Sequence, residues 1–119
     1  MEKTIIIDGK KITFRASAAI PRLYRIKFGR DIFEDIRNID KAMKNVPEGE
    51  SSTLPISALT AFENTAYLMA KHASKDAVPE ESVEEWLDKF ETFSIYEIFP
   101  AIAELWGANS ATLEKPKKK

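Results

Sequence analysis

The sequence predicts a mostly helical α+β domain in which an N-terminal β-hairpin packs on a bundle of about four to five helices. Two β-branched runs flank an Asp-Gly pair near the N-terminus. This is a strong hairpin signal, because Gly9 can adopt a positive φ angle. In the rest of the chain apolar residues recur at helical spacing, and proline and glycine residues separate these helical segments.

The hairpin is expected to pair residues 4–7 with residues 11–15. In the second run Ile12 and Phe14 alternate with polar residues, so one face of the hairpin should be buried against the helices. A two-stranded sheet is marginal by itself in water. The hairpin must therefore pack on helices or pair one of its edges with another chain.

A short first helix is expected after the hairpin. Pro21 suits the first turn of a helix, where its missing N–H group costs nothing, and Gly29 is a good C-terminal cap. The apolar face of this helix is expected to comprise Leu23, Tyr24 and Phe28.

The second helix should begin at Asp31, which forms a capping pair with Glu34, and should end near Asn45. A polar loop is expected over residues 48–53. The third helix should begin at residue 55 or 57 and be the most buried element, because it carries little charge.

Two further helical segments are expected in the C-terminal part. One should run from residue 80 or 82 to about Phe90, and the other should begin at Ser94, which forms a capping pair with Glu97. Pro100 should kink or restart the last helix, and Gly107 should end it. The predicted core comprises Phe28, Ile32, Ile36, Phe62, Leu68, Trp86, Leu87, Ile98 and Ile102.

Length and composition predict one globular domain over residues 1–107 and a flexible basic tail over residues 108–119. Cysteine is absent, which excludes disulfides and thiolate metal sites, so a reducing cytoplasm is the natural compartment. The apolar run near the N-terminus is too short for a signal peptide or a membrane span.

The net charge is −1, but the charge is unevenly distributed. Residues 10–30 hold seven basic and no acidic side chains, whereas residues 80–97 hold seven acidic side chains and one lysine. The simpler interpretation is that both are solvated faces, which can meet within one fold. Alternatively, the two charge clusters steer a charged partner or pair one copy with another, so a homo-oligomer is also expected.

The sequence shows no set of residues typical of a catalytic site, and no catalytic, cofactor-binding or metal-binding residue is predicted. The single histidine, His72, lies beside Lys71 and Lys75 and suits the C-terminal end of a helix. An acidic cluster over residues 80–85 could loosely hold a cation, but acidic residues also favour a first helical turn. The protein is therefore not expected to be an enzyme.

Partner-binding candidates fall in two regions, the basic head and the aromatic-rich C-terminal third. The head could contact phosphate groups, which leaves open a small nucleic-acid-binding regulator as the alternative function. A sequence pI of about 5.9 argues against that alternative. The candidates are Arg22, Tyr24, Arg25, Phe28, Arg30, Phe93, Tyr96 and Trp106.

Residues 14–32 contain the run Pro-Arg-Leu-Tyr-Arg-Ile-Lys-Phe-Gly-Arg-Asp-Ile, which begins at Pro21. This run resembles the N-terminal signature of the phage tail assembly chaperones of siphophages that infect Gram-positive hosts. The wider layout, up to Trp106, is similar too: a hairpin, then helices, then a Trp-containing segment and a Ser-x-x-Glu helix. Two interpretations of the matching positions stay open: determinants of the fold, or contacts with a partner.

The resemblance implies a non-enzymatic assembly factor without cofactors. Such proteins keep the tape-measure protein soluble and bring subunits of the major tail-tube protein to it. They act in the cytoplasm of the host bacterium and are absent from the mature virion. A longer form of the same protein, made by ribosomal frameshifting, is typical of the family. The lysines at residues 117–119 would fit such a form, because lysine codons can supply the A-rich sequence on which the ribosome slips.

Overall fold

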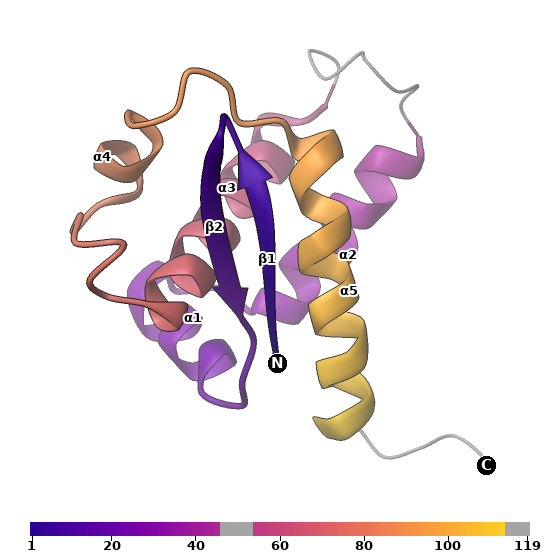
Figure 1. Ribbon diagram of the computed structural model, residues 1–119. Coiled ribbons are helices and arrows are strands. Elements are labelled where there is room, and N and C mark those ends of the chain that lie inside the picture. Colours follow the sequence, from indigo (N-terminus) through magenta and orange to yellow (C-terminus); the bar gives the residue numbers. More distant parts are fainter. Residues whose placement is uncertain (46–53, 114–119) are drawn as a thin grey trace.

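A computed structural model describes residues 1–45 and 54–113, with side chains placed through residue 107 (Figure 1). The predicted α+β class is confirmed, because within these residues a two-stranded antiparallel hairpin precedes five helices. The polar loop expected at residues 48–53 and the end of the expected tail, residues 114–119, lie outside the described residues. The elements are β1 (Glu2–Ile7), β2 (Lys10–Arg15), α1 (Ile20–Phe28), α2 (Ile32–Lys44), α3 (Ile56–Ala73), α4 (Val83–Leu87) and α5 (Ile95–Leu113).

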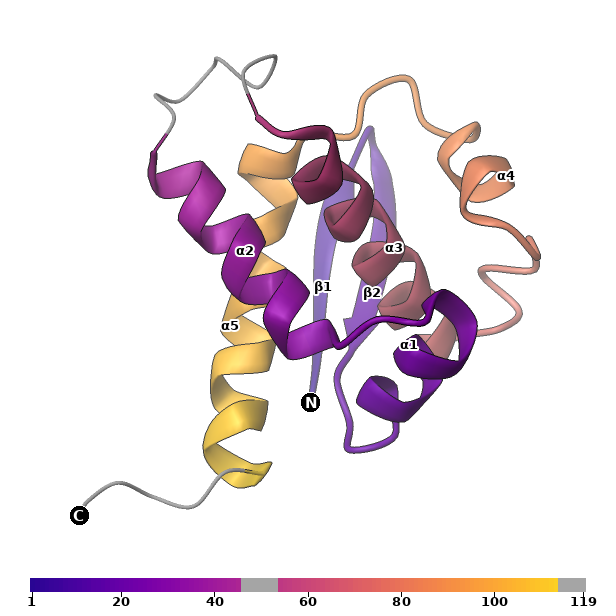
Figure 2. The ribbon, with the colours of Figure 1, turned by 180° about the vertical axis from the view of Figure 1, so that it is seen from behind.

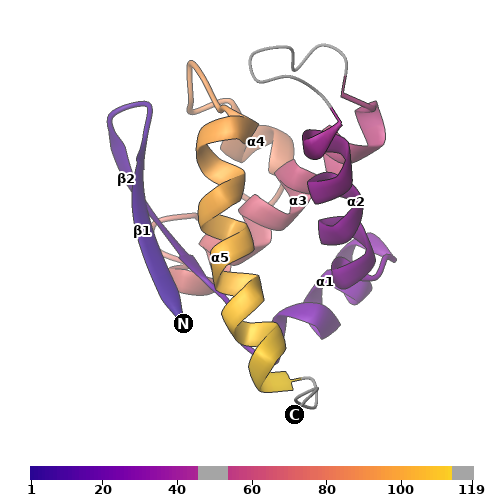
Figure 3. The same cartoon turned by 90° about the vertical axis from the view of Figure 1, so that its right-hand side faces the viewer.

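The elements are arranged in three layers. Figure 3 shows the hairpin on one side, α3 and α5 in the middle, and α1 and α2 on the far side. Figure 2 shows from behind that α2 runs beside α3 and that α1 lies at the lower end of α3, with the hairpin beyond. Helix α3 is therefore covered by β2 on one side and by α1 and α2 on the other, which explains why nine of its residues are buried.

The hairpin pairs as the Asp-Gly signal predicts. Asp8 and Gly9 have φ angles of 54° and 78°, the positive values that a tight two-residue turn requires. Ile5 lies opposite Ile12, and Phe14 is completely buried, so the predicted inner face packs on the helices. The strands begin earlier than expected, at Glu2 and Lys10.

The turn between α1 and α2 also follows the sequence prediction. Pro21 lies in the first turn of α1, and Gly29 caps its C-terminal end with φ 71° while its N–H donates to the Arg25 carbonyl. Asp31 then caps α2, because its Oδ1 accepts a hydrogen bond from the Phe33 N–H at 3.0 Å. The chain can reverse here because Gly29 adopts the left-handed conformation at no steric cost.

The predicted apolar face of α1 was partly wrong. Ile20 and Tyr24 are the buried residues, whereas Leu23 is 37% exposed. The helix begins at Ile20, so residues spaced by four along it face the core and Leu23 lies beside that stripe. Three residues predicted to be largely buried are only half-buried: Phe28, Ile36 and Leu87.

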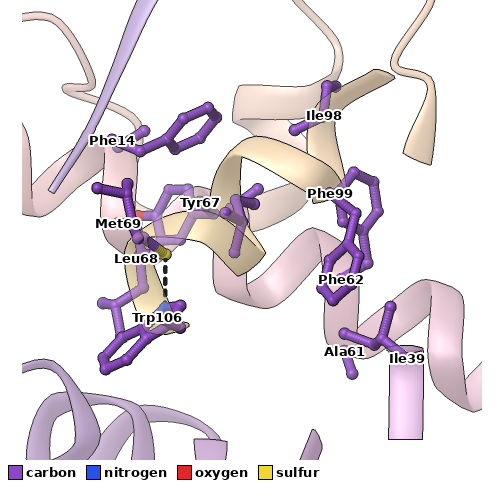
Figure 4. Packing of buried hydrophobic residues seen from close by; sticks show 14 of the residues in the cluster. Phe14, Ile39, Ala61, Phe62, Tyr67, Leu68, Met69, Ile98, Phe99 and Trp106 are labelled. Atoms are coloured by element: carbon purple, nitrogen blue, oxygen red, sulfur yellow. Dashed lines mark hydrogen bonds between the residues drawn. The ribbon is translucent and has the colours of Figure 1, made fainter. Parts of the chain in front are cut away.

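The core forms around α3, with side chains from the hairpin and α5 (Figure 4). Phe62 is 2% exposed and Tyr67 is completely buried. Trp106 of α5 reaches α3, where its Nε1–H donates to the Sδ of Met69 at 3.0 Å. The indole is therefore buried without leaving its only donor unpaired.

Two predicted helix ends were wrong. Helix α4 ends at Leu87 instead of Phe90, because the next residues make i to i−3 turns in which the Phe90 N–H donates to the Leu87 carbonyl. Helix α5 continues through Pro100 and past Gly107 to Leu113. Gly107 lowers helix propensity but does not end a helix unless it adopts a cap conformation, as Gly29 does.

Candidate functional site

An open groove is lined by side chains from α1, the end of β2 and the C-terminal end of α3. These parts of the chain lie at the lower left of Figure 1. The volume of the groove is about 710 Å³, compared with about 340 Å³ for a second groove between α2 and α5. No acidic side chain lines it. We call it the basic groove; its lining residues are Arg15, Leu23, Ile26, Lys27, Leu68, Lys71, His72 and Lys75.

The floor of the basic groove is aliphatic. Ile26 is 69% exposed and Leu23 is 37% exposed, while Leu68 beneath them is nearly buried. Both exposed residues lie on α1, whose core-facing stripe is occupied by Ile20 and Tyr24. The register that buries this stripe therefore leaves Leu23 and Ile26 in contact with solvent.

The rim beside β2 is organised by His72, near the end of α3. Its Nε2 lies 3.0 Å from Ser17 Oγ and 3.3 Å from Arg15 Nη1. Arginine can only donate, so Nε2 acts as the acceptor, which is the neutral form of the ring. Burial, followed by the positive charges of Arg15 and Lys75, lowers the pKa of His72 and favours the same neutral form.

The opposite rim carries two lysines near the ring of Tyr67. Lys27 Nζ lies 5.7 Å and Lys71 Nζ lies 5.8 Å from the ring centroid. Lys71 also donates to the carbonyls of Val78 and Glu80 at 3.0 and 2.9 Å, so it fixes the segment that leads to α4. Lys27 makes no ion pair within the described residues and keeps its charge available to a partner.

A buried polar cluster sets the position of α1. Asp35, at the start of α2, is 1% exposed. It accepts a hydrogen bond from the Tyr24 hydroxyl at 2.8 Å and a bidentate pair from Arg30, whose Nη2 lies 2.7 Å from Oδ1. The cluster ties α1 to α2 and thereby orients the helix that carries the groove floor.

The pKa values in this cluster support a fixed charge state. Burial alone would raise the pKa of Asp35, but the hydrogen bonds from Arg30 and Tyr24 outweigh it and hold that pKa below its ordinary value. Burial, and then the hydrogen bond to Asp35, raises the pKa of Tyr24 well above its ordinary value. Asp35 is thus an ionised acceptor and Tyr24 a protonated donor at neutral pH.

The structure does not bring the eight predicted partner-binding residues together. Tyr24 and Trp106 are buried in the core, although Trp106 also lines the second groove between α2 and α5. Their apolar rings pack more favourably inside the domain than in water, and each has a hydrogen-bond partner there. Arg30 is committed to Asp35.

The remaining candidates are distributed over separate surfaces. Arg22 and Arg25 are exposed on α1 but do not line the basic groove. Phe28 is half-buried against Tyr24, with ring centroids 4.9 Å apart. Phe93 and Tyr96 are half-buried and line a small pocket of about 220 Å³ on another part of the surface: Leu59, Phe62, Glu63, Thr92, Phe93, Ser94, Ile95 and Tyr96.

Several residues of the signature around Pro21 have structural roles. Pro21, Gly29 and Asp31 set the ends of α1 and α2, and Tyr24 and Arg30 form the cluster with Asp35. Leu23 and Lys27 of the same signature line the basic groove. The signature therefore combines determinants of the fold with exposed residues of α1, some of which line the basic groove.

Sequence reasoning missed the basic groove as a unit, although one signal was available. Ile26 is flanked by Arg25 and Lys27, and it does not belong to the stripe that contains Ile20 and Tyr24. An isoleucine off the core stripe of a basic helix has no reason to be buried. The contribution of His72 and Lys75 depends on tertiary packing, which no local pattern reveals.

The basic and acidic clusters approach each other within the chain. Lys27 and Phe28 of α1 line a shallow pocket of about 390 Å³ together with Glu81 and Glu84 beside and within α4. This arrangement matches the simpler interpretation, in which the two clusters are solvated faces of one fold. Acidic residues on this side also raise the pKa of Glu63, where burial acts first and the charge of Glu84 adds to it.

Groups of three or more metal-ligating side chains that could hold a metal ion are absent from the described residues. Within the same part of the chain, no helix has the length and apolar character needed to cross a membrane. Comparison with protein-family models, curated proteins and solved structures finds no match to this chain.

Proposed function

We propose that this protein is a phage tail assembly chaperone that binds the tape-measure protein, keeps it soluble and helps to recruit subunits of the major tail-tube protein. The basic groove supports the proposal, because it exposes two neighbouring aliphatic side chains in an open groove, which is a candidate binding surface for a partner. The resemblance of residues 14–32 to such chaperones supports the same function.

The mechanism is covering of apolar surface. A tape-measure protein is a long helix whose apolar stripe must be shielded until the tube polymerises around it. An amphipathic helix binds by placing its apolar residues in a groove, here against Leu23 and Ile26. Many copies with modest individual affinity would cover a long helix and still leave as tube subunits arrive.

This role places the protein in the cytoplasm of the bacterial host and outside the mature virion. It requires no catalytic residue and no cofactor. A longer frameshifted form would present the same groove and add a segment for tube subunits.

Co-expression with the tape-measure protein of the same phage or prophage tests the proposal. We expect the soluble fraction of the tape-measure protein to rise when the chain is present, and the two proteins to co-purify. An unchanged soluble fraction would contradict the proposal.

The alternative is a nucleic-acid-binding regulator, which the exposed Arg22 and Arg25 and the basic groove favour. Against it, the groove floor is aliphatic and offers no aromatic ring on which a base could stack. A gel-shift assay at moderate salt separates the two functions. DNA retardation that is lost in Arg22→Glu/Arg25→Glu would favour the regulator, because phosphate contacts depend on those cations.

A further inference from the structure

We infer that the basic groove selects an amphipathic helix whose apolar stripe is bordered by acidic residues. This inference rests on the proposed function and names the chemistry of the partner segment. Two features of the groove carry it: the solvent-exposed aliphatic floor, and a rim on which every titratable side chain is basic.

The floor requires an apolar partner surface. Ile26 and Leu23 are among the few large hydrophobic residues left exposed in the described part of the chain, and they lie side by side in one groove. The others, at Met1, Ile6 and Ile56, line none of the grooves described above. Covering an exposed isoleucine removes apolar surface from water, which is the main favourable term in association.

The rim determines the charge of the partner. Arg15, Lys27 and Lys75 make no ion pair within the described residues, and Lys71 is held by carbonyl groups that do not neutralise it. The chain as a whole has a net charge of −1, so this local positive charge opposes the overall sign. A partner with acidic residues along its stripe would be steered to the groove, and one with basic residues would be repelled.

A second copy of the chain is a poor occupant. Its acidic residues gather around α4, which has only five residues. The apolar side chains of that helix pack on its own core: Trp86 is completely buried, and Val83 and Leu87 are partly buried. This copy offers negative charge without a fully exposed apolar stripe. A small molecule is also disfavoured, because such sites orient their ligand with placed polar groups. Here His72 is already engaged by Ser17 and Arg15.

The test uses two synthetic helical peptides with one identical leucine stripe, flanked by glutamates in one peptide and by lysines in the other. Binding to the full chain is measured by fluorescence anisotropy at low and high salt. We expect the glutamate peptide to bind at least about tenfold more tightly at low salt, with the preference shrinking at high salt. Ile26→Gln should weaken its binding about tenfold, and Ile56→Gln, another exposed helical isoleucine, should not.

Charge variants test whether the rim selects a partner by its charge, separately from whether the floor covers the partner's apolar stripe. Lys27→Glu/Lys75→Glu should abolish or reverse the preference between the peptides, whereas Lys41→Glu on α2, remote from the groove, should leave it intact. Equal binding of both peptides, or a preference unaffected by Lys27→Glu/Lys75→Glu, would overturn the inference. Solubilisation of the tape-measure protein that still depends on Ile26 would then leave the proposed function standing.

Two further outcomes would show that the groove holds a second copy of the chain or neither peptide. If light scattering shows that Ile26→Gln converts a dimer of this chain into a monomer, the occupant is a second copy and the inference is wrong. If neither peptide binds, the inference is likewise overturned, and co-expression alone decides the proposed function.

Discussion

Tyr24→Phe removes one hydroxyl group from the cluster that fixes α1 against α2. The Tyr24 hydroxyl donates to Asp35 Oδ2 at 2.8 Å, and the two residues are 0% and 1% exposed. A hydrogen bond to a charged group stabilises a protein by ~1.5–3 kcal/mol. Asp35 keeps its hydrogen bonds to Arg30, so the carboxylate is not orphaned. We therefore expect the free energy of unfolding to fall by an amount near the lower end of this range, ~1.5–2 kcal/mol.

Urea denaturation at constant pH measures this loss, and the melting temperature should fall by about 5–10 °C. Tyr96→Phe is the matched control, because the Tyr96 hydroxyl is buried and has no hydrogen-bond partner within the described residues. Removing an unpaired buried hydroxyl should be neutral or stabilising. If Tyr24→Phe lowers the free energy of unfolding no more than Tyr96→Phe does, the cluster does not hold α1 in place.

Three further predictions concern the turn, the core and the groove rim. Gly9→Val should destabilise the protein by ~1–2 kcal/mol. The reason is backbone strain at a φ angle of 78°, since no atom obstructs the new side chain. An unchanged urea midpoint would argue against this. Phe62→Ala, at a site 2% exposed, should cost ~3–5 kcal/mol, and a native-like melting curve would contradict that burial. The lowered pKa of His72 means that the unfolded state binds more protons near the ordinary value of ~6.5, so stability should fall as pH drops through that value and below it. His72→Asn should flatten this slope between neutral and mildly acidic pH, and an identical slope would refute the assignment.

Local chemistry made most of the fold predictable. Gly9 and Gly29 need positive φ angles, and Asp31 must cap a helix, so short-range signals were enough for the hairpin and the turn between α1 and α2. Helix ends were less predictable. Gly107 could end a helix or continue one, and only the structure shows that α5 continues to Leu113.

The candidate site was less predictable than the fold. Helical periodicity identifies apolar residues but does not say which side of a short helix faces the core, so Leu23 was assigned to the wrong environment. Aromatic residues in basic surroundings looked available to a partner, but Tyr24 is needed inside the domain. The basic groove joins residues from β2, α1 and α3, and such a combination depends on packing between distant segments.

The soluble fraction of a co-expressed tape-measure protein tests the central claim most directly when three forms of the chain are compared. Wild type and Ile56→Gln should keep the tape-measure protein in solution, because Ile56 lies at the start of α3, away from the basic groove. Ile26→Gln, which removes the most exposed side chain of the groove floor without changing charge, should lower that soluble fraction. Equal soluble fractions with Ile26→Gln and wild type would contradict the claim that this groove holds the partner.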